Sequence, residues 1–136
     1  MSSDRARFLA SGARDEGVEF PGDYERRVEL TTSSTRIGRR SRREPSLPEL
    51  DLTGPPTDPG ISRRHARLLW EAHGWTLLDL GSSNGTDVNR ERVEPHRPKL
   101  LASGDTIGLG LWTLVRLVRA DGGGGNDRER IDRRDR

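Results

Sequence analysis

Turn-forming residues divide most of this chain into short segments, and this spacing constrains the fold more than any other feature. Glycine, proline and Asn-Gly pairs recur roughly every eight to twelve residues, at Gly38, Gly54-Pro55-Pro56, Pro59-Gly60, Gly74, Gly81, Asn84-Gly85, Pro95 and Gly104-Asp105. Between the turns apolar and polar residues alternate, whereas no stretch repeats apolar residues with the period of a helix. Many short strands at this spacing predict an all-β sandwich.

Two apolar segments in the middle of the chain form the clearest strand pair. Residues 65–72 and 75–80 are rich in apolar side chains, and only His73-Gly74 lies between them. A connection this short predicts a tight hairpin. Two further strands are expected at 106–109 and 111–118, on either side of a glycine.

The chain has room for one domain and two tails. It contains 136 residues, of which 29% are hydrophobic and 34% are charged, and the apolar residues concentrate in its middle part. We therefore expect a domain at residues 25–119, preceded by an N-terminal extension at residues 1–24. Within this extension, Phe8-Leu9-Ala10 favours a first short strand near residues 6–10. The Gly-rich and charged segment 120–136 is expected to be a flexible tail.

The composition excludes several classes of function. The sequence has no cysteine, which excludes disulfides, thiolate metal sites and thiol catalysis. No apolar run is long enough for a signal sequence or a membrane span, so we expect a cytoplasmic protein without a membrane partner. Because neither a metal ligand set nor an activated nucleophile is evident, we expect no metal, no cofactor and no enzymatic activity.

Positive charge is concentrated locally. The net charge is only +2, from 24 basic and 22 acidic residues. Five arginines lie within residues 36–43, where no acid occurs, and three more lie within residues 63–67. If the fold brings these clusters together, their field would attract an anionic ligand. Nucleic-acid binding through the Arg-rich loops is therefore an alternative function.

Three short segments carry side chains suited to binding a phosphorylated peptide. They are Gly38-Arg39, Ser62-Arg63-Arg64-His65 and Ser82-Ser83-Asn84-Gly85-Thr86. An arginine offers a fork of donors to an oxyanion, and a serine hydroxyl adds another. An asparagine amide can bind a peptide main chain through both its donor and its acceptor. A phosphothreonine provides the matching ligand, since it carries close to two negative charges and three acceptor oxygens.

In order and spacing these segments, together with Gly104–Gly110, resemble the forkhead-associated (FHA) domain family of bacterial, actinobacterial-like type. The resemblance covers roughly residues 26–119. It implies a β-sandwich of about eleven strands in two sheets, with apical loops that bind phosphothreonine. The implied phosphopeptide-binding residues are Arg39, Ser62, Arg63, Ser83 and Asn84, and the residues that shape the site are Gly38, His65 and Gly85. The implied partner is a phosphothreonine-containing protein, the substrate of a Ser/Thr protein kinase, and we expect the reader to be a monomer.

A nucleophile and its base are another interpretation of Ser62 and His65. We reject it because no third group is seen to orient the pair. The family resemblance also implies that the histidine supports the loop without touching phosphate. Asp79, just before the third segment, is expected to brace that loop.

Overall fold

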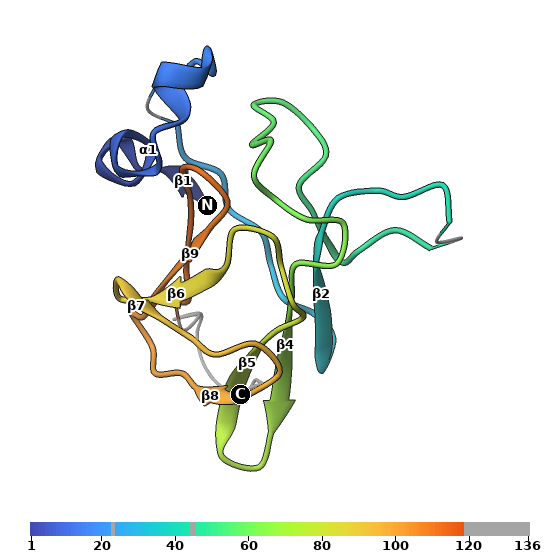
Figure 1. Cartoon of the computed structure of the whole chain (residues 1–136). Helices are drawn as coiled ribbons and strands as arrows, with labels where there is room; N and C mark the ends of the chain where they lie inside the picture. Colours follow the sequence, from blue (N-terminus) through green and yellow to red (C-terminus); the bar gives the residue numbers. More distant parts are fainter. Residues whose placement is uncertain (23, 44–45, 119–136) are drawn as a thin grey trace.

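The computed structural model describes residues 1–22, 24–43 and 46–118, whose ten strands form two five-stranded sheets (Figure 1). The first sheet has the order β1 (Ser2–Ser3), β10 (Thr113–Arg116), β9 (Thr106–Leu109), β6 (Thr86–Val88) and β7 (Glu91–Arg92). The second has the order β3 (Leu50–Asp51), β2 (Ser34–Gly38), β4 (Ala66–Glu71), β5 (Gly74–Asp79) and β8 (Lys99–Leu100). Neighbouring strands are antiparallel except β2 and β3, which are parallel. The predicted all-β sandwich is confirmed, with ten strands in the described residues where about eleven were expected.

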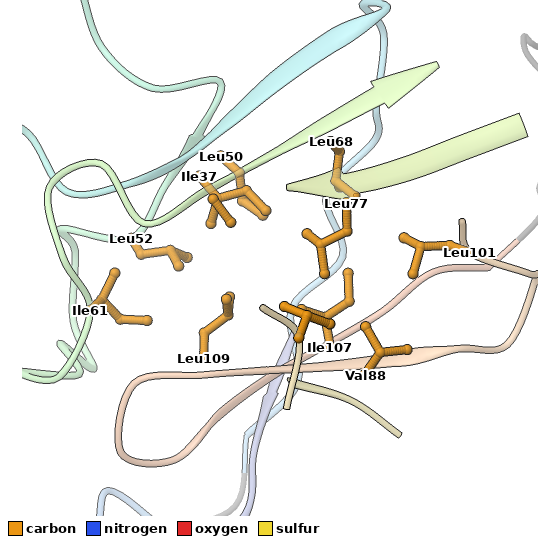
Figure 2. Close-up of a cluster of buried hydrophobic side chains, with 12 residues drawn as sticks. Ile37, Leu50, Leu52, Ile61, Leu68, Leu77, Val88, Leu101, Ile107 and Leu109 are labelled. Carbon is orange, nitrogen blue, oxygen red and sulfur yellow. The ribbon is translucent and has the colours of Figure 1, made fainter. Parts of the chain in front are cut away.

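A hydrophobic core fills the space between the sheets. Figure 2 shows Leu68 and Leu77 of the second sheet facing Ile107 of the first. The core arises from alternation along each strand, because every second side chain points to the same face. Its buried members are Ile37, Leu50, Leu52, Ile61, Ala66, Leu68, Leu77, Val88, Val93, Leu101, Ile107 and Leu109. Because Ile61 is 1% exposed, the loop that precedes β4 is anchored in this core.

The hairpin predicted in the middle of the chain is formed by β4 and β5. Glu71 pairs with Gly74 at the turn, and Trp70 pairs with Trp75 one step further in, where their ring centroids are 5.3 Å apart. Gly74 has a φ of 115°, which an L side chain rarely adopts. The turn therefore depends on the glycine that the sequence places there.

The N-terminal segment corrects one expectation. No strand forms near residues 6–10; these residues belong to helix α1 (Arg5–Ser11), which the short 3₁₀ helix η1 (Ala13–Glu16) follows. The side chain of Asp4 caps α1 by accepting a hydrogen bond from the backbone N–H of Arg7. Gly12 ends the helix with a φ of 76°, and its N–H donates to the carbonyl of Leu9. These two caps define a helix that a search for apolar alternation cannot detect.

Residues 1–22 pack on the sandwich and form a second, aromatic cluster there. Phe8 is 2% exposed and packs with Phe20 against Trp112, which precedes β10. Tyr24 completes the group by an edge-to-face contact with Trp112, with ring centroids 6.0 Å apart. In addition, β1 pairs with β10. The first part of the chain is therefore bound to the domain along its first sheet (Figure 1).

The tail expected at residues 120–136 lies outside the described residues. Among the residues that the structure does describe, neither helix has the length and apolar character needed to span a bilayer. In the same residues, no three side chains of the metal-binding types come together.

Candidate functional site

Three loops meet where β2 ends, β4 begins and β5 leads into β6. Gly38, the last residue of β2, packs directly against the backbone of the loop before β4. A Cβ atom at Gly38 would lie 1.9 Å from the carbonyl oxygen of Arg63, so no other residue fits without moving the backbone. The next residue, Arg39, donates a hydrogen bond from Nε to the carbonyl of Ile61 at 2.5 Å. This bond fixes the guanidinium beside Ser62.

Ser62 joins its loop to the loop between β5 and β6. Its Oγ accepts a hydrogen bond from the backbone N–H of Ser83 at 3.0 Å, and the two hydroxyl oxygens are 3.5 Å apart. The adjacent Arg63 is exposed. Within the described part of the chain, neither Arg39 nor Arg63 pairs with a carboxylate. The uncompensated Arg39 guanidinium therefore lies beside the Ser62–Ser83 pair, and the exposed Arg63 follows Ser62 directly in the chain.

His65 connects the loop before β4 to the loop between β5 and β6. It is fully buried, and its Nδ1 accepts a hydrogen bond from the backbone N–H of Ser62 at 3.0 Å. Its Nε2 lies 3.1 Å from the carbonyl of Gly85. An acceptor Nδ1 carries no proton, so this pattern assigns the proton to Nε2, which donates to Gly85. Burial lowers the pKa of His65, which keeps the ring neutral, as this pair of bonds requires.

Asn84 lies at the exposed edge of the same site. Its Nδ2 donates to the carbonyl of Gly60 at 2.9 Å, which orients the amide across the loop before β4. Gly85 follows with a φ of 80°, and a Cβ there would lie 2.1 Å from the Arg92 guanidinium. The structure thus brings the sequence-predicted binding residues together in these three loops: Arg39, Ser62, Arg63, Ser83 and Asn84. The residues expected to shape the site, Gly38, His65 and Gly85, contact the backbone or side chains of the same loops.

A family model of the FHA domain matches residues 35–110, more than half of the chain. This chain belongs to the FHA domain family. The chain is 41% identical over 71 residues to the glycogen accumulation regulator GarA of Mycolicibacterium smegmatis, which is 51% of this chain and 43% of GarA. This mycobacterial relative supports the actinobacterial-like type expected from the motifs. The chain spans less than half the length of the curated relatives that it matches.

The chain is also similar to solved structures of FHA domains. One FHA domain with phosphothreonine-dependent interactions is 32% identical, with a TM-score of 0.52 over 73% of this chain and 88% of that chain. The FHA domain of an Arabidopsis thaliana hypothetical protein is 34% identical, with a TM-score of 0.54 over 75% of this chain and 77% of that chain. FHA domains are recognition modules, and the fold that these comparisons share is the two-sheet sandwich described above.

Asp79 braces the loop between β5 and β6 of this FHA domain, as expected from its position. It is 1% exposed, and its carboxylate accepts hydrogen bonds from the hydroxyls of Ser82 and Thr86, both at 2.6 Å. The backbone N–H groups of Gly81 and Ser82 add two more. Burial by itself would raise the pKa of Asp79, but these four bonds outweigh it and lower the pKa below its usual value.

Asp58 is a buried residue that the sequence analysis missed. Only 2% exposed, it accepts hydrogen bonds from the backbone of Gly60 and from three consecutive backbone N–H groups, those of residues 111–113. It therefore joins the loop before β4 to the turn between β9 and β10. Nothing in the local sequence Thr57-Asp58-Pro59-Gly60 distinguishes it from an exposed turn residue.

The Arg-rich stretch 36–43 is less positive than its sequence indicates. Arg36 forms a two-pronged ion pair with Glu49, with Nε–Oε1 and Nη2–Oε2 distances of 3.0 and 2.8 Å. Hydrogen bonds from Arg36 lower the pKa of Glu49 to about 2. Arg40 pairs with Asp51 at 2.7 Å. Two of the five arginines are therefore neutralised, which weakens the case for nucleic-acid binding by this FHA domain.

Proposed function

We propose that this FHA domain binds phosphothreonine in partner proteins that a Ser/Thr protein kinase has phosphorylated. The main support is the position of Arg39, whose guanidinium is bonded to the residue before Ser62 and so lies close to the Ser62 hydroxyl. Among the described residues Arg39 has no carboxylate partner. Because Nε of Arg39 is bonded to Ile61, its two terminal nitrogens remain as a preset fork for phosphate oxygens. Such preorganisation reduces the entropy lost on binding.

The neighbouring residues complete the proposed ligand contacts. Arg63 is exposed beside Ser62 and supplies a second cation for a phosphate of nearly two charges. The Asn84 amide, oriented by Gly60, keeps its oxygen and one N–H for the peptide main chain. Ser83 is the neighbour whose hydroxyl faces that of Ser62. We propose that these groups bind the phosphate and the adjoining backbone together.

The geometry of His65 supports a binding role without catalysis. A base for the Ser62 hydroxyl would have to accept its proton, but Nδ1 of His65 accepts the Ser62 backbone N–H and Nε2 donates to Gly85. Both ring nitrogens are therefore occupied by structural bonds. We propose that the domain is a monomeric, non-enzymatic phosphothreonine-binding module. We place it in the cytoplasm, because protein kinases there have the ATP needed to phosphorylate its partners.

The test compares phosphothreonine, phosphoserine and unphosphorylated versions of one oriented peptide library. We expect binding only of phosphorylated peptides, with a preference for phosphothreonine, and loss of this binding in Arg39→Ala. The matched control is Arg42→Ala, which removes the same charge from an exposed position three residues along the loop. Equal binding of all three peptide versions would contradict the proposal. DNA affinity that survives Arg39→Ala and falls steeply with salt would favour the nucleic-acid alternative.

A further inference from the structure

The N-terminal segment, residues 1–22, contacts the domain through Arg7, which lies before the part matched by the FHA family model. Arg7 is on α1, and its guanidinium lies close to Gly108 of β9. Its guanidinium forms an ion pair with Asp87 of β6 and donates from Nε to the carbonyl of Gly110 at 3.0 Å. Gly108 makes room for this pair, because a Cβ there would lie 2.4 Å from the Asp87 carboxylate and 2.6 Å from Arg7. Arg7 therefore bonds to the first residue of the turn between β9 and β10.

Asp58 holds the same β9–β10 turn in place. The backbone N–H groups of Leu111, Trp112 and Thr113 donate to its carboxylate at 3.0, 3.0 and 3.1 Å, and the Thr113 hydroxyl adds a bond at 2.8 Å. Gly110 has a φ of 60°, and a Cβ there would lie 2.7 Å from the same carboxylate. The position of the turn therefore determines the position of the Asp58 side chain, and Arg7 fixes one end of the turn.

Asp58 passes this constraint to the candidate site through Gly60. Its Oδ1 accepts the Gly60 N–H at 2.8 Å, and the Gly60 carbonyl accepts Nδ2 of Asn84 at 2.9 Å. The fit is close, because a Cβ on Gly60 would lie 2.8 Å from the backbone nitrogen of Leu111 and 3.1 Å from Nδ2 of Asn84. A shift of the turn would therefore displace the carbonyl that orients the Asn84 amide.

We propose that Arg7 and Asp58 are positioning residues for Asn84, so that the N-terminal segment is a working part of the peptide-binding site. The inference rests on the function proposed above, since Asn84 matters only if it binds a peptide main chain. The bonded groups run without interruption from Arg7 to the turn, to Asp58, to Gly60 and to Asn84. Each link is a hydrogen bond between groups that are at least partly buried, where such bonds have few competing water partners.

The first experiment titrates the full chain with a phosphothreonine peptide selected from the library and follows fluorescence anisotropy. Arg7→Gln, which removes the charge and the bond to Gly110, should weaken binding by roughly fivefold or more. Asp58→Asn should weaken it at least as much. The matched control Arg14→Gln removes the same charge from an exposed residue of η1 and should leave affinity unchanged. If Asp58→Asn does not fold, Arg7→Gln alone decides the result.

Two readouts separate positioning from a loss of stability. In a double-mutant cycle, the penalty of Arg7→Gln should shrink to less than about twofold in an Asn84→Ala background, because the two residues act through one contact. In the free domain, Arg7→Gln should shift the NMR signals of the Asn84 side-chain amide, whereas Arg14→Gln should not. An undiminished penalty in the Asn84→Ala background, or an unmoved Asn84 amide, would overturn the positioning role.

The failures of the two proposals are distinguishable. Wild-type protein that binds phosphorylated and unphosphorylated peptides equally would refute the phosphothreonine reader, and the Asn84 amide signals would still test the chain of contacts. Phosphothreonine binding that Arg39→Ala abolishes and Arg7→Gln leaves intact would refute only the role of Arg7.

Discussion

Replacement of His65 by leucine should destabilise the domain and disconnect its binding loops. Leucine is close to histidine in volume but lacks both ring nitrogens, so the Ser62 N–H and the Gly85 carbonyl would lose their partners. A buried polar group without a partner costs about 1–3 kcal/mol, so two such groups cost about 2–6 kcal/mol. Because Ser62 and Gly85 are only half-buried, water can replace part of each bond, and we expect about 2–4 kcal/mol.

The assay is urea denaturation with linear extrapolation, which also checks that the slope against denaturant is unchanged. His73→Leu is the matched control, because His73 is exposed at the turn between β4 and β5. The same His65 variant should bind the phosphothreonine peptide at least an order of magnitude more weakly, since its two loops are no longer tied together. A His65→Leu domain within about 0.5 kcal/mol of the wild type would refute the supporting role assigned to the ring.

Three further predictions concern the site and its supports. Arg39→Ala should weaken phosphothreonine binding roughly tenfold to a hundredfold, from a charge-assisted contact of about 1.5–3 kcal/mol. Loss of its hydrogen bond to the Ile61 carbonyl should lower the free energy of unfolding by no more than about 1.5 kcal/mol, and a larger loss would mean that Arg39 is chiefly structural. Gly38→Ala should destabilise the domain by about 1–3 kcal/mol, because its methyl group meets the Arg63 backbone, and denaturation curves would show this. Because burial lowers the pKa of His65 below 6.5, the unfolded chain takes up a proton at a higher pH than the folded domain does. The free energy of unfolding should therefore fall as pH drops below about 6.5, and denaturation of His65→Leu between pH 7 and 5.5 should lack this component.

The candidate site could be predicted from sequence because its residues stand next to strand ends. Gly38 ends β2, and His65 immediately precedes β4, so Arg39 and Ser62 belong to loops at the same end of neighbouring strands. Antiparallel pairing of β2 with β4 then brings the loops together without any information about distant contacts. The supporting role of His65 followed from the same placement, although its two hydrogen-bond partners did not.

Helix α1 could not be predicted from alternation because its stabilisation is mostly tertiary. It has seven residues, of which only Phe8 is buried, so no apolar period develops. The cap residues Asp4 and Gly12 are visible in the sequence, but such residues also occur in turns. The decisive contact of Arg7 is with Asp87, eighty residues away in the chain. Short helices of this kind form because the rest of the domain gives them a surface to pack on.

The sequence overestimates the positive charge of residues 36–43 because acidic partners can come from a neighbouring strand that is distant in the sequence. The window 36–43 holds no acid, yet the parallel register of β2 with β3 sets Ile37 opposite Leu50. That register places Glu49 beside Arg36, and Asp51 reaches Arg40. Exposed ion pairs of this type contribute little to the free energy of unfolding, but they cancel the local positive electrostatic field. Among the described residues, Arg39 keeps its charge unpaired, and it is also the arginine that the family motif selects. Within the part of the chain that the structure describes, pairing of Arg36 and Arg40 therefore leaves Arg39 as the unpaired arginine directly after β2, where a phosphate would bind, whereas the unpaired Arg42 and Arg43 lie further along the loop.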